Sequence, residues 1–227
     1  MKTRKHLLKA GLLAGCVLAA TDVGAADGEA TSRLYIRGGL GAALSEDTEL
    51  TEFFGEAVDN NKVKLDTGVR LDAAVGYRVT DWFAAEGELG VVFNTVDSVE
   101  GSTDADDLSF TQAPFLVNVV FQWPNRTRLV PYIGAGGGGS VNVITGDNFT
   151  LGGTTLDGSA GDLTWTYQAF GGLRYQISPQ MSAGIAYKFS VTGDVEWEAD
   201  SIIGATETAR MNGITTHSIA AVFTFRF

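Results

Sequence analysis

The sequence predicts an all-β fold, an eight-stranded antiparallel transmembrane β-barrel with short periplasmic turns and long extracellular loops. Three observations predict it: eight segments of alternating apolar and polar residues, a regular alternation of short and long connections, and an export-type N-terminus. In a strand, successive side chains point to opposite faces. A secreted sandwich would bury the apolar face, whereas a bilayer inverts the pattern, with apolar side chains toward lipid and polar ones toward the lumen.

The last eleven residues, 217–227, show the alternation most clearly. Phe223, Phe225 and Phe227 share one face with two smaller apolar residues, and Thr224 and Arg226 lie on the other. Three alternating phenylalanines at a strand end have no place on a water-exposed surface, and this favours a strand in a membrane wall. The other alternating segments are expected at residues 34–44, 69–79, 83–94, 115–123, 129–143, 164–177 and 181–192.

The connections between these segments fall into two groups that alternate along the chain. Residues 80–81, 124–128 and 178–180 are short turns, whereas the other connections are long and polar and comprise residues 45–66, 95–109, 144–162 and 193–213. This is the pattern of a barrel with short periplasmic turns and longer outer loops. Because the strand number is even, both ends of the barrel are expected on the periplasmic side. Pro114 and Pro131 are expected near strand ends, where a missing N–H is tolerated.

The N-terminus predicts export and sets the domain boundaries. Lysines and an arginine within residues 1–9 precede an apolar run over residues 10–20 and the small residues Val23, Gly24 and Ala25. This pattern indicates a signal peptide over residues 1–25, followed by a short segment over 26–32 and a barrel over 33–227. An alternative is lipidation of Cys16, because residues 13–16 match a lipobox. Cys16 is the single cysteine, so no internal disulfide is expected.

The charge balance limits the possible partners. The formal net charge is −11, and most of the acidic residues lie in the four long connections. Nucleic acid is not expected as a partner, because phosphate contacts need clusters of lysine and arginine. The acidic loops are instead expected to be solvated, to contact an extracellular ligand, or to approach anionic outer-membrane lipids through divalent ions. Their spacing does not match a dedicated calcium site.

The polar faces of the strands carry charges that would lie inside the barrel. Because isolated buried charges are very costly, we expect these side chains to pair with one another in a lumen charge network. Glu86 and Glu88 share a face near Arg70 and Arg78, which predicts ion pairs rather than a catalytic carboxylate pair. The predicted network comprises Arg37, Arg70, Asp72, Arg78, Glu86, Glu88, Arg174 and Lys188.

No catalytic, cofactor-binding or metal site is predicted. His217 is the only histidine after the signal peptide, which removes most general-base and metal schemes. It is adjacent to Ser218, so the two side chains should face opposite ways rather than form a nucleophile–base pair. The glycine run over residues 134–139 lacks the Gly-Lys-Ser/Thr ending of a phosphate-binding loop, and close strand approach explains it better.

Several motifs carry a family resemblance. The segment Gly76-Tyr77-Arg78-Val79-Thr80-Asp81-Trp82-Phe83 resembles a hairpin of small outer-membrane barrels, and Pro131-Tyr132-Ile133-Gly134-Ala135-Gly136 resembles one of their strands. Residues 167–189 continue the similarity, and the C-terminal strand resembles the closing strand of such barrels. The chain is thus similar, over nearly all of residues 33–227, to the outer-membrane β-barrel domain superfamily, which includes OmpA-type barrels, OmpX and opacity-type surface proteins.

The resemblance implies a location and partners. It implies a multi-pass barrel in the bacterial outer membrane that contacts outer-membrane lipids. It also implies that Phe223, Phe225 and Phe227 act as an assembly signal for the barrel-assembly machinery. The expected function is a non-enzymatic structural or surface-interaction role, adhesin-like in kind. A small channel for ions or hydrophobic solutes is the alternative, and a lipid-modifying barrel enzyme is less favoured.

Overall fold

The computed structural model describes residues 33–53, 56–99, 108–151, 154–200 and 206–227. These residues belong to one compact unit, Thr31–Phe227. The predictions for the signal peptide, for Cys16 and for the segment over residues 26–32 lie outside the described residues. Among the residues described, no helix is long and apolar enough to cross a membrane.

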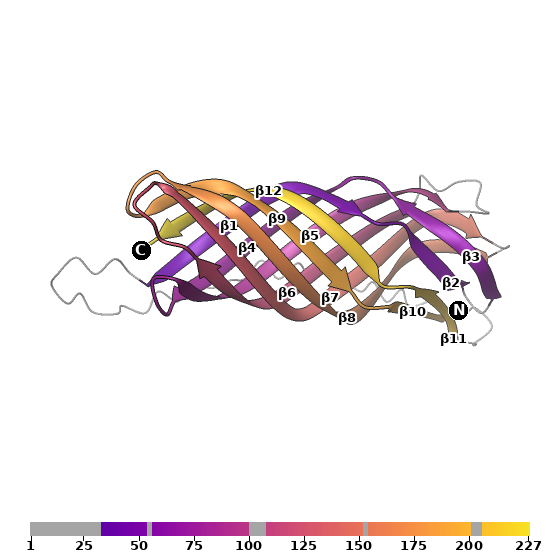
Figure 1. Cartoon of the computed structure of the whole chain (residues 1–227). Helices are drawn as coiled ribbons and strands as arrows, with labels where there is room; N and C mark the ends of the chain where they lie inside the picture. Colours follow the sequence, from indigo (N-terminus) through magenta and orange to yellow (C-terminus); the bar gives the residue numbers. More distant parts are fainter. Residues whose placement is uncertain (1–32, 54–55, 100–107, 152–153, 201–205) are drawn as a thin grey trace, which may run out of the picture. The chain divides into compact units, whose positions relative to one another are not determined.

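Eight long strands form a closed antiparallel barrel (Figure 1), which confirms the predicted fold class. Each strand pairs with its neighbours in the order β5-β4-β1-β12-β9-β8-β7-β6, and β6 pairs with β5 to close the ring. The barrel strands are β1 (Leu34–Ser45), β4 (Gly68–Arg78), β5 (Phe83–Val99), β6 (Leu108–Gln122), β7 (Leu129–Leu151), β8 (Thr154–Gln176), β9 (Met181–Thr192) and β12 (Ile214–Arg226).

The side chains alternate between the inside and the outside as the sequence predicts. In β4, Val69, Leu71 and Val75 are exposed on the outer surface, whereas Arg70 and Asp72 are buried. The same alternation runs through the other barrel strands, and the outer surface is dominated by large apolar side chains. The barrel therefore has an apolar exterior and a polar interior, the inverse of a water-soluble fold.

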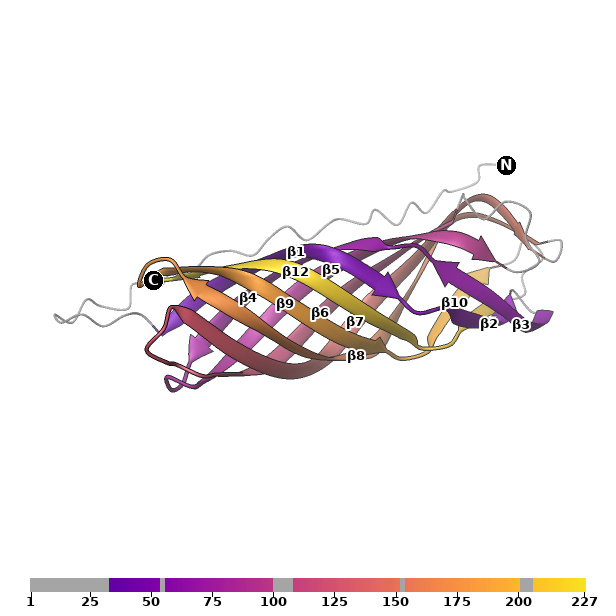
Figure 2. The ribbon, with the colours of Figure 1, turned by 45° about the horizontal axis from the view of Figure 1, so that its top comes forward.

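Four further strands form a sheet at the end of the barrel opposite the C-terminus (Figure 2). We call this sheet the platform. Its order is β3-β2-β11-β10, and β3 joins it to the outer part of β5. The platform strands are β2 (Thr48–Phe53), β3 (Glu56–Leu65), β10 (Val195–Asp200) and β11 (Thr206–Met211).

The predicted long loops are therefore largely strands. Besides the platform hairpins, β7 and β8 remain paired as far as Leu151 and Thr154, deep inside the predicted loop over 144–162. Outside a bilayer a strand needs no continuous apolar face, so the hydrophobic alternation stops while the hydrogen-bonded pairing continues. The sequence pattern marks the apolar belt of the barrel and not the full length of its strands.

Two backbone details depend on small or unusual residues. A Cβ on Gly138 would collide with the carbonyl oxygen of Phe115, so the strands of this wall approach too closely for any larger residue. Pro114 lies within β6 and not near its end, contrary to expectation. It lacks an N–H, and the β5–β6 register has no pairs between Leu89↔Phe115 and Val92↔Gln112.

Candidate functional site

The centre of the lumen is organised around one carboxylate. Glu88 on β5 forms ion pairs with Arg37 at 2.8 Å, Arg70 at 3.2 Å and Lys188 at 2.7 Å. It also accepts hydrogen bonds from the amides of Asn118 at 3.0 Å and Gln168 at 3.1 Å. These partners come from β1, β4, β9, β6 and β8, so a single side chain connects β5 to five other barrel strands.

Two more carboxylates complete this central cluster. Asp72 pairs with Arg37 at 3.3 Å and with Lys188 at 3.1 Å, and Glu86 pairs with Arg37 at 2.8 Å. Arg70 is 3.6 Å from Asp72, and the Tyr35 hydroxyl donates to Glu86 at 2.7 Å. Three cations therefore face three carboxylates. Because each charge is matched by an opposite one, the ion pairs offset part of the cost of burying these groups.

The structure leaves two predicted members outside the central cluster. Arg78 lies at the end of β4 and pairs with Asp81 of the adjacent turn at 3.0 Å, because Asp81 is only three residues away. Arg174 donates to the side-chain oxygen of Gln122 at 2.7 Å and lies 4.5 Å from the ring centre of Tyr132. It has no carboxylate partner among the described residues.

Sequence reasoning did not include the uncharged members of this network. Asn118 and Gln168 each contact Glu88, and they bond to each other at 3.0 Å. Both are inward-facing amides within otherwise apolar alternating segments. Their placement on the polar face was visible in the sequence, but amides carry no charge that would have marked them as partners.

An apolar cluster lies beside the central cluster of charges and also fills part of the lumen. It comprises Tyr35, Ala84, Val120, Tyr132, Phe170, Ala186 and Val222, all nearly fully buried. The Tyr132 and Phe170 rings meet edge to face at 6.4 Å, and the Arg37 guanidinium lies 5.6 Å from the Phe170 ring centre. Bulky rings thus occupy the lumen together with the ion pairs.

One small cavity lies among these side chains. A cavity of about 10 Å³ lies in the polar part of the lumen, roughly the room that one water molecule requires. Its lining includes Arg70, Gln112, Thr166 and Gln168. An eight-stranded barrel is just wide enough to be filled by side chains. The central lumen is therefore packed rather than open.

We expect the purified protein to show no stable porin-like conductance in planar bilayers, with at most small, flickering events. The reason is that ion pairs and rings cross the lumen without a continuous water column. The Phe170→Ala variant, which removes one ring of the apolar cluster, should flicker more often than the wild type. Large ohmic steps from a homogeneous, monomeric wild-type sample would contradict the expectation and favour a channel.

His217 and Ser218 do not form a nucleophile–base pair. His217 faces outward, where its Nδ1 is 2.6 Å from the Tyr187 hydroxyl and its Nε2 is 3.1 Å from Glu46. Ser218 is buried on the opposite face, and its hydroxyl has no hydrogen-bond partner among the described residues. Throughout the residues that the structure describes, no three His, Cys, Asp or Glu side chains are grouped so that they could hold a metal ion.

The C-terminal phenylalanines lie on the outer face of β12 and at its end. Phe223 and Phe227 are exposed there, and the rings of Phe225 and Phe227 meet at 5.5 Å. An exposed edge-to-face aromatic pair suits the interface between lipid and water. Recognition of these residues by an assembly machinery stays a prediction.

A closed antiparallel barrel with an apolar exterior, a polar interior and short turns at one end is the architecture of a bacterial outer-membrane protein. The family comparison agrees with this class. The outer membrane protein beta-barrel domain family matches residues 12–227, so the chain belongs to that family. The predicted family resemblance and outer-membrane location are thereby confirmed.

Solved outer-membrane proteins share this fold at low sequence identity. OprG from Pseudomonas aeruginosa is 18% identical with a TM-score of 0.58, and the match covers 86% of this chain and 96% of OprG. AlkL is 13% identical with a TM-score of 0.52, and the match covers 91% of this chain and 96% of AlkL. Neisserial surface protein A is 14% identical with a TM-score of 0.50, and the match covers 86% of this chain and 98% of the neisserial protein. A search of curated protein sequences gives no significant match.

Proposed function

We propose that this protein is a non-enzymatic outer-membrane barrel that presents its platform to a positively charged partner at the cell surface. The observation that carries the proposal is the platform itself. Segments that were expected to be loops form an ordered sheet continuous with the barrel wall. The filled lumen supports the same view, because it leaves the outer end of the molecule as the accessible functional surface.

The platform is held together by packing and by hydrogen bonds. Val63, Val195 and Met211 are almost fully buried, although they lie on strands outside the barrel. The Thr48 hydroxyl donates to the backbone carbonyl of Asn212 at 3.0 Å, and this links the start of β2 to the turn between β11 and β12. A preorganised surface loses less conformational entropy on binding than a flexible loop does.

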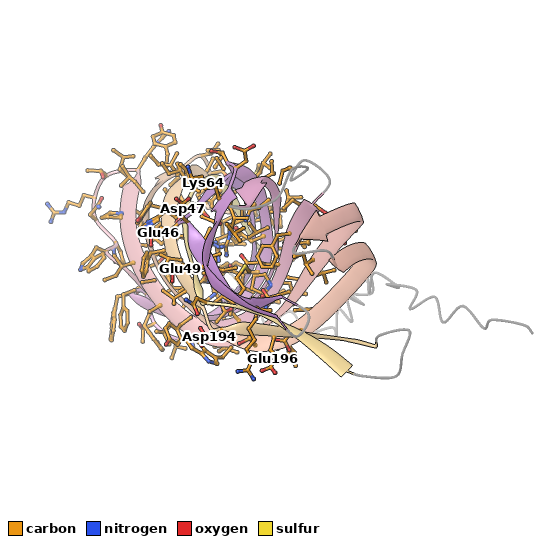
Figure 3. All side chains as sticks on the ribbon, turned by 90° about the vertical axis from the view of Figure 1, so that its right-hand side faces the viewer. Glu46, Asp47, Glu49, Lys64, Asp194 and Glu196 are labelled. Atoms are coloured by element: carbon orange, nitrogen blue, oxygen red, sulfur yellow. The ribbon has the colours of Figure 1, made fainter. Side chains whose placement is uncertain are left out.

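The charge of the platform supports a positively charged partner. Figure 3 shows Glu46, Asp47, Glu49, Asp194 and Glu196 along one arc of the outer end, with Lys64 nearby. Glu46, Asp47, Asp194 and Glu196 are exposed. Complementary potentials steer association and determine specificity. A basic protein or peptide surface fits this arc, whereas a second copy of this acidic chain would be repelled.

The test measures binding of a fluorescent deca-lysine peptide to the protein in zwitterionic nanodiscs, with deca-glutamate as the reference probe. The triple variant Asp47→Asn, Glu49→Gln, Asp194→Asn should bind deca-lysine about tenfold more weakly, from three surface pairs of about 0.5 kcal/mol each. Added salt should weaken the wild-type interaction, because exposed charges are screened.

The matched control is Asp81→Asn, which removes one acidic side chain from a turn at the opposite end of the barrel. Its affinity for deca-lysine should equal that of the wild type. Equal binding by the wild type and the triple variant would contradict the proposal. Equal loss in the triple variant and in Asp81→Asn would show a general charge effect and would also contradict it.

A further inference from the structure

The turn end of the barrel has the opposite charge to the platform. Six arginines lie in or beside the short turns and at the adjoining ends of the strands, namely Arg33, Arg78, Arg126, Arg128, Arg174 and Arg226. In the three short turns, residues 79–82, 123–128 and 177–180, Asp81 is the only acidic side chain. The central cluster matches its own charges, and its Glu86, which lies in register with Gly76, is paired with Arg37 and accepts a hydrogen bond from Tyr35.

Three of these arginines lie on the inner face of the barrel mouth. Arg226 pairs in register with Tyr35, which also lies opposite Gly76, two residues before Arg78. On the other side of β12, Val222 lies opposite Gly184, and Gly184 lies opposite Arg174. The Tyr35 side chain lies over Gly76, and Gly184 lies against the backbone of Leu173 and Arg174, so neither glycine places a side chain of its own in the mouth.

These three guanidinium groups lack full charge compensation. Arg226 has no ion-pair partner among the described residues, and Arg174 contacts only an amide and an aromatic ring. Arg78 pairs with Asp81, whose side chain is 88% exposed, and this exposure weakens the pair through solvent screening.

Unsatisfied hydrogen-bond donors lie beside the same arginines. The Nε atom of Arg78, the hydroxyl of Thr224 and the hydroxyl of Tyr132 are buried without a partner among the described residues. Thr224 lies two residues before Arg226 on the same face, and the Tyr132 ring lies under the Arg174 guanidinium. A buried donor without a partner is destabilising, and an acceptor that occupies the site would remove that cost.

We infer that the periplasmic mouth of the lumen, formed by Arg78, Arg174 and Arg226 with the hydroxyls of Thr224 and Tyr132, binds a phosphate-type oxyanion. Guanidinium groups form charge-assisted, bidentate bonds with phosphate oxygens, and hydroxyl donors suit the remaining oxygens. Short turns mark the periplasmic end of an outer-membrane barrel. Two sources share this chemistry: a free phosphate compound of the periplasm and the headgroup of an anionic phospholipid.

The test uses the purified protein in phosphatidylcholine nanodiscs, titrated calorimetrically with inorganic pyrophosphate at constant ionic strength. Saturable binding is expected with pyrophosphate and not with chloride. A second arm compares the thermal midpoint in nanodiscs with and without phosphatidylglycerol. Pyrophosphate binding identifies the free source, and stabilisation by phosphatidylglycerol alone identifies the lipid source. The absence of both overturns the inference.

The variants separate this site from a general charge effect. Arg226→Gln should weaken the observed interaction at least about tenfold, since it removes charge-assisted hydrogen bonds. Thr224→Val removes one neutral donor and should weaken it about threefold. The control Arg126→Gln removes the same charge from an exposed turn and should change affinity less than twofold. Equal losses in Arg226→Gln and Arg126→Gln overturn the inference.

Folding of each variant is checked by its heat-modifiable mobility in gel electrophoresis. If Arg226→Gln fails to fold, the comparison of Thr224→Val with Arg126→Gln decides the outcome, because neither change removes an arginine from the mouth. Unchanged binding in Thr224→Val then counts against the site, and selective weakening in Thr224→Val supports it.

Discussion

Replacing Glu88 with leucine is expected to destabilise the barrel by about 3–5 kcal/mol, the typical cost of breaking a buried ion pair by removing one partner. Glu88 is 2% exposed and contacts Arg37, Arg70 and Lys188. Leucine would leave these three cations with two carboxylates, Asp72 and Glu86, and would also leave two buried amides with one acceptor fewer. Both consequences oppose folding, so the effect should lie at the upper end of this range.

The measurement is the free energy of unfolding in lipid vesicles, obtained from urea titration followed by tryptophan fluorescence. Glu196→Leu is the matched control, because Glu196 forms an exposed pair with Arg210 on the platform at 2.9 Å. An exposed pair contributes about 0–1 kcal/mol, so the control should change the free energy of unfolding little. A Glu88→Leu variant as stable as the control would show that the central cluster does not hold the strands together.

Replacing Leu89 with arginine is expected to cost about 2–4 kcal/mol, the typical penalty for arginine on the lipid face near the bilayer midplane. Leu89 follows Glu88 directly, yet it is 56% exposed on the outer surface. It lies opposite Ala73 and Phe115, well inside the apolar belt. The arginine would have neither water nor a counter-charge at this depth.

The same vesicle titration measures this effect, with Leu163→Arg as a control for depth. Leu163 is also exposed on the outer surface, but it lies beyond the last β8–β9 pair, toward the platform. Arginine there should cost about 0–1 kcal/mol, as expected near the membrane interface. If Glu88→Leu and Leu89→Arg were both tolerated, the assignment of inside and outside would be wrong.

The faces of the strands could be predicted because they are a local property. Strand side chains alternate with a period of two, so the apolar residues of β4 and β12 show their orientation without any knowledge of neighbouring strands. The extent of the strands could not be predicted in the same way. Residues 154–163 pair with β7 although their sequence is mostly polar and glycine-rich, because backbone hydrogen bonds outside the bilayer do not require an apolar face.

The charges of the lumen were predictable, but their pairing was not. Glu88 and Lys188 are separated by 100 residues in sequence, and only the closure of the barrel brings their atoms to 2.7 Å. Arg78 lies on the same face as Arg70, yet its position at the strand end favours Asp81 of the nearby turn. Pairing depends on height along the barrel axis, and strand register determines this height.

By itself, the sequence determined that this chain is an outer-membrane barrel and which side chains face its lumen, because the alternation of apolar and polar residues and the position of each charge are local properties of the sequence. Only the tertiary structure decided that Glu88 is the centre of the ion pairs, that the outer connections build a platform, and that Arg78, Arg174 and Arg226 lie at the same end of the lumen. Each of these features combines strands that are distant in sequence. Their proximity follows from barrel closure and register, which no single segment encodes.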